Sequence, residues 1–86
     1  MGKHEKVVET ILRGTSDANI AFEDIRGVLL HFGFEERIRG SHHMYRKEGI
    51  DEKVNIQRAG NKAKPYQVKQ VREVLLKYHL TVGNDV

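Results

Sequence analysis

The residues best suited to chemistry lie together in segment 40–45, which reads Gly-Ser-His-His-Met-Tyr. An imidazole has an ordinary pKa of about 6.5, so a histidine exchanges protons at neutral pH and can act as a general acid or base. RNA cleavage needs such proton transfer, because the 2′-OH loses a proton as it attacks phosphorus and the leaving 5′-oxygen gains one. The pair His42 and His43 is therefore a candidate site for this chemistry.

The two histidines should point in opposite directions if this segment is a strand, since neighbouring strand residues alternate between faces. Tyr45 is the larger hydrophobe, so we expect Ser41, His43 and Tyr45 to face the covered side of a sheet. His42 and Met44 would then lie on the open face. This divergence argues against shared ligation of a metal ion. The alternative interpretation is that both are ordinary strand histidines without a chemical role.

Basic residues at the start of the last predicted helix form a second group of candidates. Lys62 and Lys64 precede Pro65, which fits the first helical position because its missing N–H costs nothing there. The free N–H groups and the dipole of a helix N-terminus favour an anion, so the two lysines are predicted phosphate contacts. Lys69 and Arg72 continue this face one and two turns on. The alternative is a solvated charged face.

Further cations alternate along the first two predicted strands. Arg37 and Arg39 share one face of the first strand, with Glu36 and Ile38 on the other, and Arg46 and Lys47 end the second strand. These cations either steer RNA or only keep an edge strand soluble.

The composition limits the classes of protein and of site. The 86 residues, of which 38% are hydrophobic, suffice for one domain with one modest core. Without cysteine there is no disulfide, thiolate metal site or thiol nucleophile, and we expect no metal and no cofactor. No apolar run approaches the roughly 20 residues that span a bilayer, and no signal-peptide pattern is present, so we expect a cytoplasmic protein. The net charge is +3, which is compatible with a polyanionic partner but does not demand one. The excess of Lys and Arg lies in segment 37–78, so a nucleic acid that binds this protein is expected to bind there.

The predicted order of elements is α-α-β-β-β-α. Apolar residues at helical spacing predict helices over 3–13, 22–31 and 65–78, and β-favouring residues predict an antiparallel meander of strands 34–39, 42–47 and 52–57. Segment 58–64 is predicted to be a basic loop. We expect an α+β domain whose helices pack on one face of the three-stranded antiparallel sheet and leave the other face open. Residues 1–20 would be a helical extension, 21–80 the core and 81–86 a polar, frayed tail.

From about Phe22 to Leu80, the chain resembles the HicA (YcfA-like) toxins of bacterial toxin–antitoxin systems. The signature is a helix that ends in Phe-Gly-Phe at 32–34, followed by Arg-Gly-Ser-His-His-Met-Tyr-Arg-Lys at 39–47, a third strand, a basic loop and a closing amphipathic helix. The resemblance implies a double-stranded-RNA-binding-domain-like fold and an mRNA interferase activity. It also implies mRNA as substrate and neutralisation by a HicB antitoxin that covers the active histidine.

By position, the catalytic histidine of that family falls on His42, with His43 as the second candidate. The RNA-binding residues expected from the patterns and the resemblance together are Gly40, Ser41, Arg37, Arg39, Arg46, Lys47, Lys62, Lys64 and Lys69. Two features depart from the family: the extension 1–20, and Arg-Ala-Gly at 58–60 where many members carry a Pro- and His-bearing loop. The rival interpretations are a non-catalytic RNA-binding module, which has no need of an imidazole at position 42, and an adaptor acting only through a protein partner.

Overall fold

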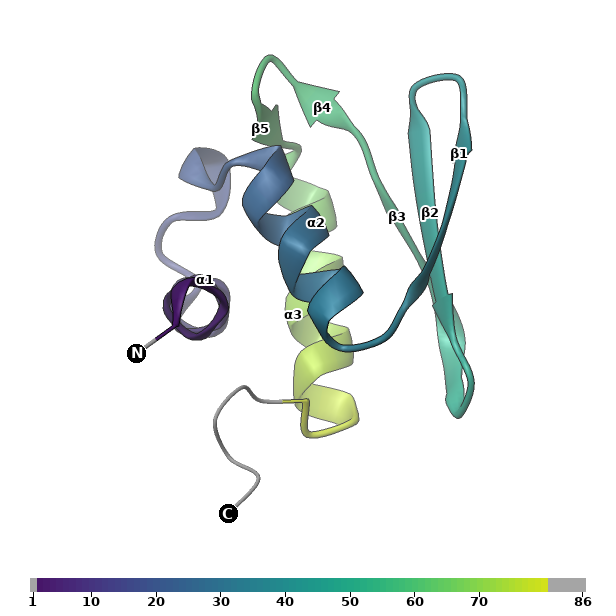
Figure 1. The fold of residues 1–86 in the computed structure, drawn as a ribbon. Coiled ribbons are helices and arrows are strands. Elements are labelled where there is room, and N and C mark those ends of the chain that lie inside the picture. The colour runs from purple at the N-terminus through teal and green to yellow at the C-terminus, as the bar shows by residue number, and fades with distance from the viewer. Residues whose placement is uncertain (1, 81–86) are drawn as a thin grey trace.

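The computed structural model is an α+β fold with three α-helices and a three-stranded antiparallel sheet (Figure 1). It describes residues 2–80, so the predicted tail 81–86 lies outside the described residues. Along the chain the elements are α1 (Lys3–Arg13), the 3₁₀ turn η1 (Asp17–Asn19), α2 (Phe22–His31), β1 (Glu35–Arg39), β2 (His42–Lys47), β3 (Ile50–Ile56), β4 (Arg58–Ala59), β5 (Lys62–Ala63) and α3 (Pro65–Lys77). No helix in this part of the chain is long and apolar enough to cross a membrane.

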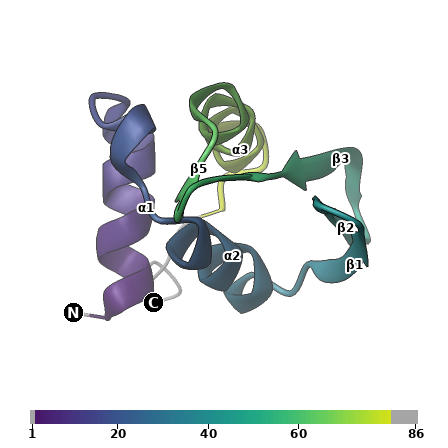
Figure 2. The ribbon, with the colours of Figure 1, turned by 90° about the horizontal axis from the view of Figure 1, so that it is seen from above.

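The molecule is layered. Seen from above, the sheet β1-β2-β3 lies on one side, α2 and α3 form the middle layer, and α1 lies beyond them (Figure 2). Each helix buries the apolar stripe that its sequence predicts, because a helix in a small domain is stabilised mainly by that face. The prediction that the helices cover one face of the sheet and leave the other open is confirmed.

Strand alternation determines what the sheet contributes to the core. Tyr45, Val54 and Ile56 are fully buried on the face toward the helices. The helices meet them with a set of fully buried apolar side chains: Phe22, Ile25, Val28, Leu29, Val68 and Val71. Burial of this apolar surface is the main favourable term in folding. The same alternation directs Arg37 and Arg39 of β1 and Arg46 of β2 away from the helices.

The prediction of a loop over 58–64 is wrong, because this segment forms the β4–β5 hairpin. Gly60 has a φ of 68°, a left-handed conformation that suits the tight turn between the two short strands. The backbone N–H of Phe22 donates to the carbonyl of Asn61, and that of Ala63 donates to Ile20. Backbone hydrogen bonds therefore join the hairpin to the segment that precedes α2.

The boundaries of three other elements differ slightly from the prediction. The third strand begins at Ile50 rather than at residue 52, because Lys47 pairs with Ile50 and only two residues form the turn. The first strand begins at Glu35 rather than at Phe34, and the last helix ends at Lys77 rather than at Tyr78.

Candidate functional site

The β1–β2 hairpin positions the two histidines. Its two-residue turn contains Gly40, whose φ of 57° suits a tight hairpin, and the exposed Ser41. In the register of the hairpin, His42 pairs with Arg39 and His43 pairs with Ile38. His42 is exposed, whereas His43 is half-buried and faces α2. The predicted assignment of His43 to the covered face and of His42 to the open face is thus confirmed.

His43 lies in a defined environment. Its side chain is 16% exposed, and its Nδ1 is buried at 3.7 Å from Oε2 of Glu36. Nδ1 has no hydrogen-bond partner among the described residues. The ring also packs edge-on against Phe22, with 4.7 Å between the ring centroids. The imidazole is therefore held between a carboxylate and an aromatic ring, an arrangement that fixes its orientation.

Glu36 is itself held by two donors. Its Oε2 accepts hydrogen bonds from Nε of Arg26 and from the hydroxyl of Tyr45, each at 2.6 Å, and Oε1 accepts from Nη2 of Arg26 at 3.0 Å. The guanidinium of Arg26 is the main reason that the pKa of Glu36 is lowered to about 2, although partial burial acts in the opposite direction. Burial and this carboxylate together raise the pKa of the Tyr45 phenol. Glu36 is thus a permanent anion beside His43.

A cation completes this cluster. The guanidinium carbon of Arg58 lies 4.3 Å from the ring centroid of Phe22, the ring that also packs on His43. Glu23 accepts a hydrogen bond from Arg58 and holds it there. We call this cluster the histidine site, and its members are Phe22, Arg26, Glu36, His43, Tyr45 and Arg58.

The predicted phosphate-binding lysines lie at the same end of the molecule. Figure 1 shows the β1–β2 turn, the β4–β5 turn and the start of α2 together at this end. Lys62 belongs to β5 and forms a bridge with Ala21, directly before α2. Lys64 is the N-cap residue of α3, and its Nζ is 3.5 Å from Oε1 of Gln57. Both lysines are partly exposed beside helix N-termini, where an anion is favoured.

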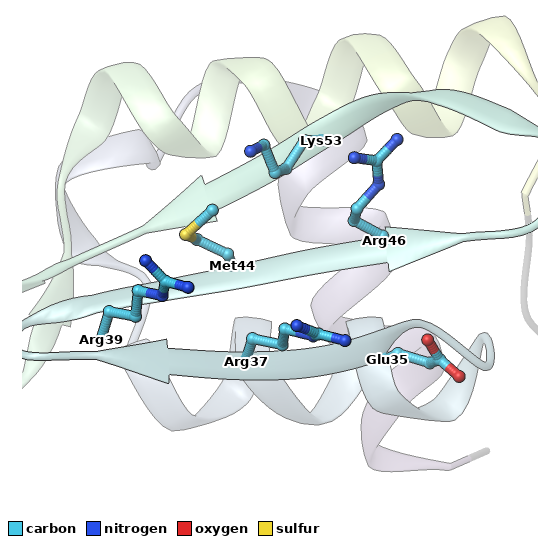
Figure 3. A pocket seen from close by; sticks show the side chains of 6 residues that line it. All are labelled: Glu35, Arg37, Arg39, Met44, Arg46 and Lys53. Carbon is cyan, nitrogen blue, oxygen red and sulfur yellow. The ribbon is translucent and has the colours of Figure 1, made fainter.

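The other predicted cations are distributed over separate surfaces. Arg37, Arg39 and Arg46 line a hollow of about 470 Å³ on the open face of the sheet (Figure 3). Lys47 lies at the opposite end of the sheet, next to Gly33, and Lys69 is exposed on α3. The predicted RNA-binding residues therefore do not form one continuous surface.

Arg72, a predicted phosphate contact, is engaged within the fold. Its guanidinium makes two hydrogen bonds to the carboxylate of Asp17, at 2.9 and 3.1 Å, and a third to the carbonyl of Ile11 at 3.1 Å. The side chain is only 17% exposed. Arg72 instead fastens α1 and η1 to α3, because each of its hydrogen bonds crosses between these elements.

Sequence reasoning missed most partners of His43. A signal for Glu36 was present, since strand alternation placed this carboxylate with Ile38 on the face of β1 opposite to Arg37 and Arg39. Nothing local in the sequence shows that Arg26 meets Glu36, or that Arg58 stacks on Phe22, because these contacts depend on how α2 and β4 pack. Tyr45 meets Glu36 because the two residues are directly opposite in the β1–β2 hairpin. Lys53, which also lines the open-face hollow, was missed for a similar reason.

Within residues 2–80, no three His, Asp or Glu side chains lie close enough together to hold a metal ion. No protein-family model, no curated protein and no solved structure matches this chain.

Proposed function

We propose that this protein is a metal-independent endoribonuclease of the HicA type, an mRNA interferase in which His43 is the general base. The observation that carries the proposal is the 3.7 Å approach of Nδ1 of His43 to Oε2 of Glu36. A carboxylate beside one ring nitrogen holds the imidazole in place and stabilises the imidazolium formed when the other nitrogen takes a proton. The proposed active nitrogen is therefore Nε2.

This proposal reverses the order of the two candidate histidines. His42 is exposed and makes no ion pair or aromatic contact with the described residues, so nothing there orients its ring. His43 combines a fixed anion, an aromatic neighbour and partial exposure. Catalytic groups need a held geometry, because small misplacements of a reacting group cost much of the rate.

The chemistry follows from the residues of the histidine site. Nε2 of His43 accepts the proton of the 2′-OH as the O2′–P bond forms and the P–O5′ bond breaks. The products are a 2′,3′-cyclic phosphate and a 5′-hydroxyl, and the proton passes from O2′ to O5′ through the imidazole and solvent. Arg58 and Lys62 supply positive charge on the same side, where the negative charge on the phosphate grows.

The arrangement of elements supports the fold that the resemblance implies. The segment α2-β1-β2-β3-α3 has a helix, a three-stranded meander and a second helix on the same face, in the order expected for a double-stranded-RNA-binding-domain-like fold. Lys62 and Lys64 lie just before the second of these helices, where such domains hold phosphates. On this proposal, the substrate is mRNA and a HicB-like antitoxin silences the enzyme by covering His43.

Purified protein, incubated with a labelled single-stranded RNA in EDTA, tests the proposal. We expect the wild type to cleave, and His43→Ala to cleave at least about a hundredfold more slowly while still binding RNA. His43→Gln keeps a similar side-chain volume and serves as the variant if His43→Ala is unstable. His42→Ala is the matched control and should cleave at nearly the wild-type rate.

The other outcomes are equally informative. Loss of cleavage in His42→Ala alone would restore the order that the sequence predicts. A wild type that binds RNA without cleaving it would favour the non-catalytic RNA-binding module. Cleavage that both variants retain would show that neither histidine is the general base. Activity that EDTA abolishes and a divalent ion restores would overturn the metal-independent mechanism.

A further inference from the structure

The open face of the sheet carries a second concentration of positive charge. Arg37 and Arg39 from β1, Arg46 from β2 and Lys53 from β3 surround Met44 in the hollow of about 470 Å³ (Figure 3). Glu35 is the one acidic residue in its lining. We call these six residues the basic hollow. They lie on the face of the sheet opposite to the helices and to Glu36 and Tyr45.

The cations of the basic hollow are not used within the fold. None of the four makes a salt bridge to a described carboxylate. By contrast, three arginines on the helix side are paired: Arg26 with Glu36, Arg58 with Glu23 and Arg72 with Asp17. Four unpaired like charges on three adjacent strands repel one another, so they destabilise the sheet unless an anion is bound.

We infer that the basic hollow binds the phosphate backbone of single-stranded RNA, and that the strand passes from there over the β1–β2 turn to His43. This inference rests on the proposed function and identifies the form of RNA that the enzyme takes. Arginine favours phosphate, because its planar guanidinium can donate two parallel hydrogen bonds to phosphate oxygens.

The dimensions of the hollow suit one strand of RNA. Three strands about 4.8 Å apart give a floor about 10 Å wide, enough for one backbone but not for the two backbones of a duplex. Arg37 and Arg39 are two residues apart along β1, so their side chains start about 7 Å apart along the strand. The lining contains no aromatic residue on which bases could stack, so its cations are left to contact the phosphates, and such contacts carry no base information.

The hollow also leads to the histidine site. Arg39 at its end pairs with His42, and the next pair along the hairpin is Ile38 with His43. The turn between them carries only Gly40 and Ser41, whose small side chains leave the edge of the sheet clear. A single strand that crosses this edge can bend there. Attack by the 2′-OH needs such a bend, because it must be in line with the P–O5′ bond, a geometry that regular A-form RNA does not provide.

Fluorescence anisotropy with a labelled single-stranded RNA and a matched duplex tests this inference. All binding is measured in the His43→Ala background, so that the RNA stays intact. The test variant Arg37→Gln/Arg46→Gln removes two charges from the basic hollow. The control Lys6→Gln/Arg13→Gln removes two exposed charges from α1, on the far side of the molecule. Thermal melts establish that both variants are folded.

We expect the test variant to bind single-stranded RNA at least about fivefold more weakly, and the slope of log affinity against log salt to flatten by about 1.4, or about 0.7 for each lost phosphate contact. The control should bind like its parent. With His43 restored, the test variant should cleave more slowly at low RNA concentration and recover at saturating RNA.

Three results would overturn the inference. If the test variant binds single-stranded RNA as tightly as the control, while the protein with His43 cleaves RNA, the basic hollow is not the RNA-binding surface. The proposed function then still stands. If the duplex binds as tightly as the single strand, and the test variant loses binding of the duplex too, the assignment to single strands is wrong. If RNA does not bind at all but a poly-glutamate peptide does, and the test variant loses the peptide, the hollow takes an acidic protein segment and the proposed function fails as well.

Discussion

Glu36 and His43 are diagonal neighbours across the β1–β2 pair, with 3.7 Å between Oε2 and Nδ1. Glu36 is directly opposite Tyr45, and His43 is opposite Ile38, so the carboxylate reaches the imidazole along the covered face. The same Oε2 accepts hydrogen bonds from Tyr45 and from Arg26 of α2. The position of this charge beside His43 therefore depends on the packing of α2 against the sheet.

Glu36→Gln should lower the cleavage rate about tenfold or more without a comparable loss of RNA affinity, because Glu36 acts through His43 and does not contact RNA. Single-turnover cleavage rates, measured together with RNA titrations, separate the effect on rate from the effect on affinity. A variant that loses affinity and rate in equal proportion would show that Glu36 is only structural.

The stability of the fold should depend on Glu36 in acid. Its pKa is lowered to about 2, chiefly by Arg26, so its contribution is fully present above the ordinary value of about 4.5 and is lost as the pH falls towards 2. We expect Glu36→Gln to cost about 2–3 kcal/mol in urea unfolding at pH 7, and the difference from wild type to disappear near pH 2. Glu9→Gln, an exposed change on α1, is the control and should alter stability little at any pH.

Much of the fold could be predicted from the sequence, because local patterns determine it. The spacing of apolar residues correctly predicts where the helices over 3–13 and 22–31 begin and end. Strand alternation correctly assigns His43 and Tyr45 to the covered face. The hairpin β4–β5 was missed because its stability comes from backbone hydrogen bonds to Ile20 and Phe22, which are far away in the sequence.

The candidate site was predictable only in part. The histidines stand out by residue type, but the difference between them depends on tertiary contacts. Glu36 approaches His43 only in the correct strand register, and Arg26 reaches Glu36 only because α2 packs beside β1. The position of Arg72 on a helix gives no hint that Asp17 pairs with it. Residue spacing reports which face a side chain occupies and leaves its distant partners undetermined.

Arg72→Ala should destabilise the protein by about 2 kcal/mol, because it leaves Asp17 and the carbonyl of Ile11 without their donor. The effect should be a loss of packing between α1 and α3, visible as faster hydrogen exchange in α1. Lys69→Ala, an exposed change one turn earlier on the same helix, should be within about 0.5 kcal/mol of the wild type in urea unfolding. A stable Arg72→Ala variant that binds RNA poorly would instead support the phosphate contact that the sequence predicts.

Lys62→Ala/Lys64→Ala tests whether the helix-side lysines also hold the RNA. The first turn of α3 has no side-chain cap, and Lys64 is the N-cap residue itself. Pro65 has no N–H and those of Gln67 and Val68 donate to the carbonyl of Lys64, so a phosphate there would meet the N–H of Tyr66 together with positive charge. We expect weaker binding to all RNA sequences and a flatter salt dependence, because phosphate contacts carry no base information. Unchanged affinity and salt slope in a filter-binding titration would show that these lysines are only solvated charge.

Combining this variant with Arg37→Gln/Arg46→Gln distinguishes one continuous path from two separate sites. Lys62 and Lys64 lie on the helix side of the molecule, so a strand that contacts both groups must cross the β1–β2 turn. With an RNA long enough to reach both, the combined loss of binding free energy should equal the sum of the two losses, since the sites share no contacts. With an RNA too short to cross the turn, each molecule engages one site, and the remaining site should keep binding when the other is removed. Combined losses that are additive at both lengths would contradict a path over the turn.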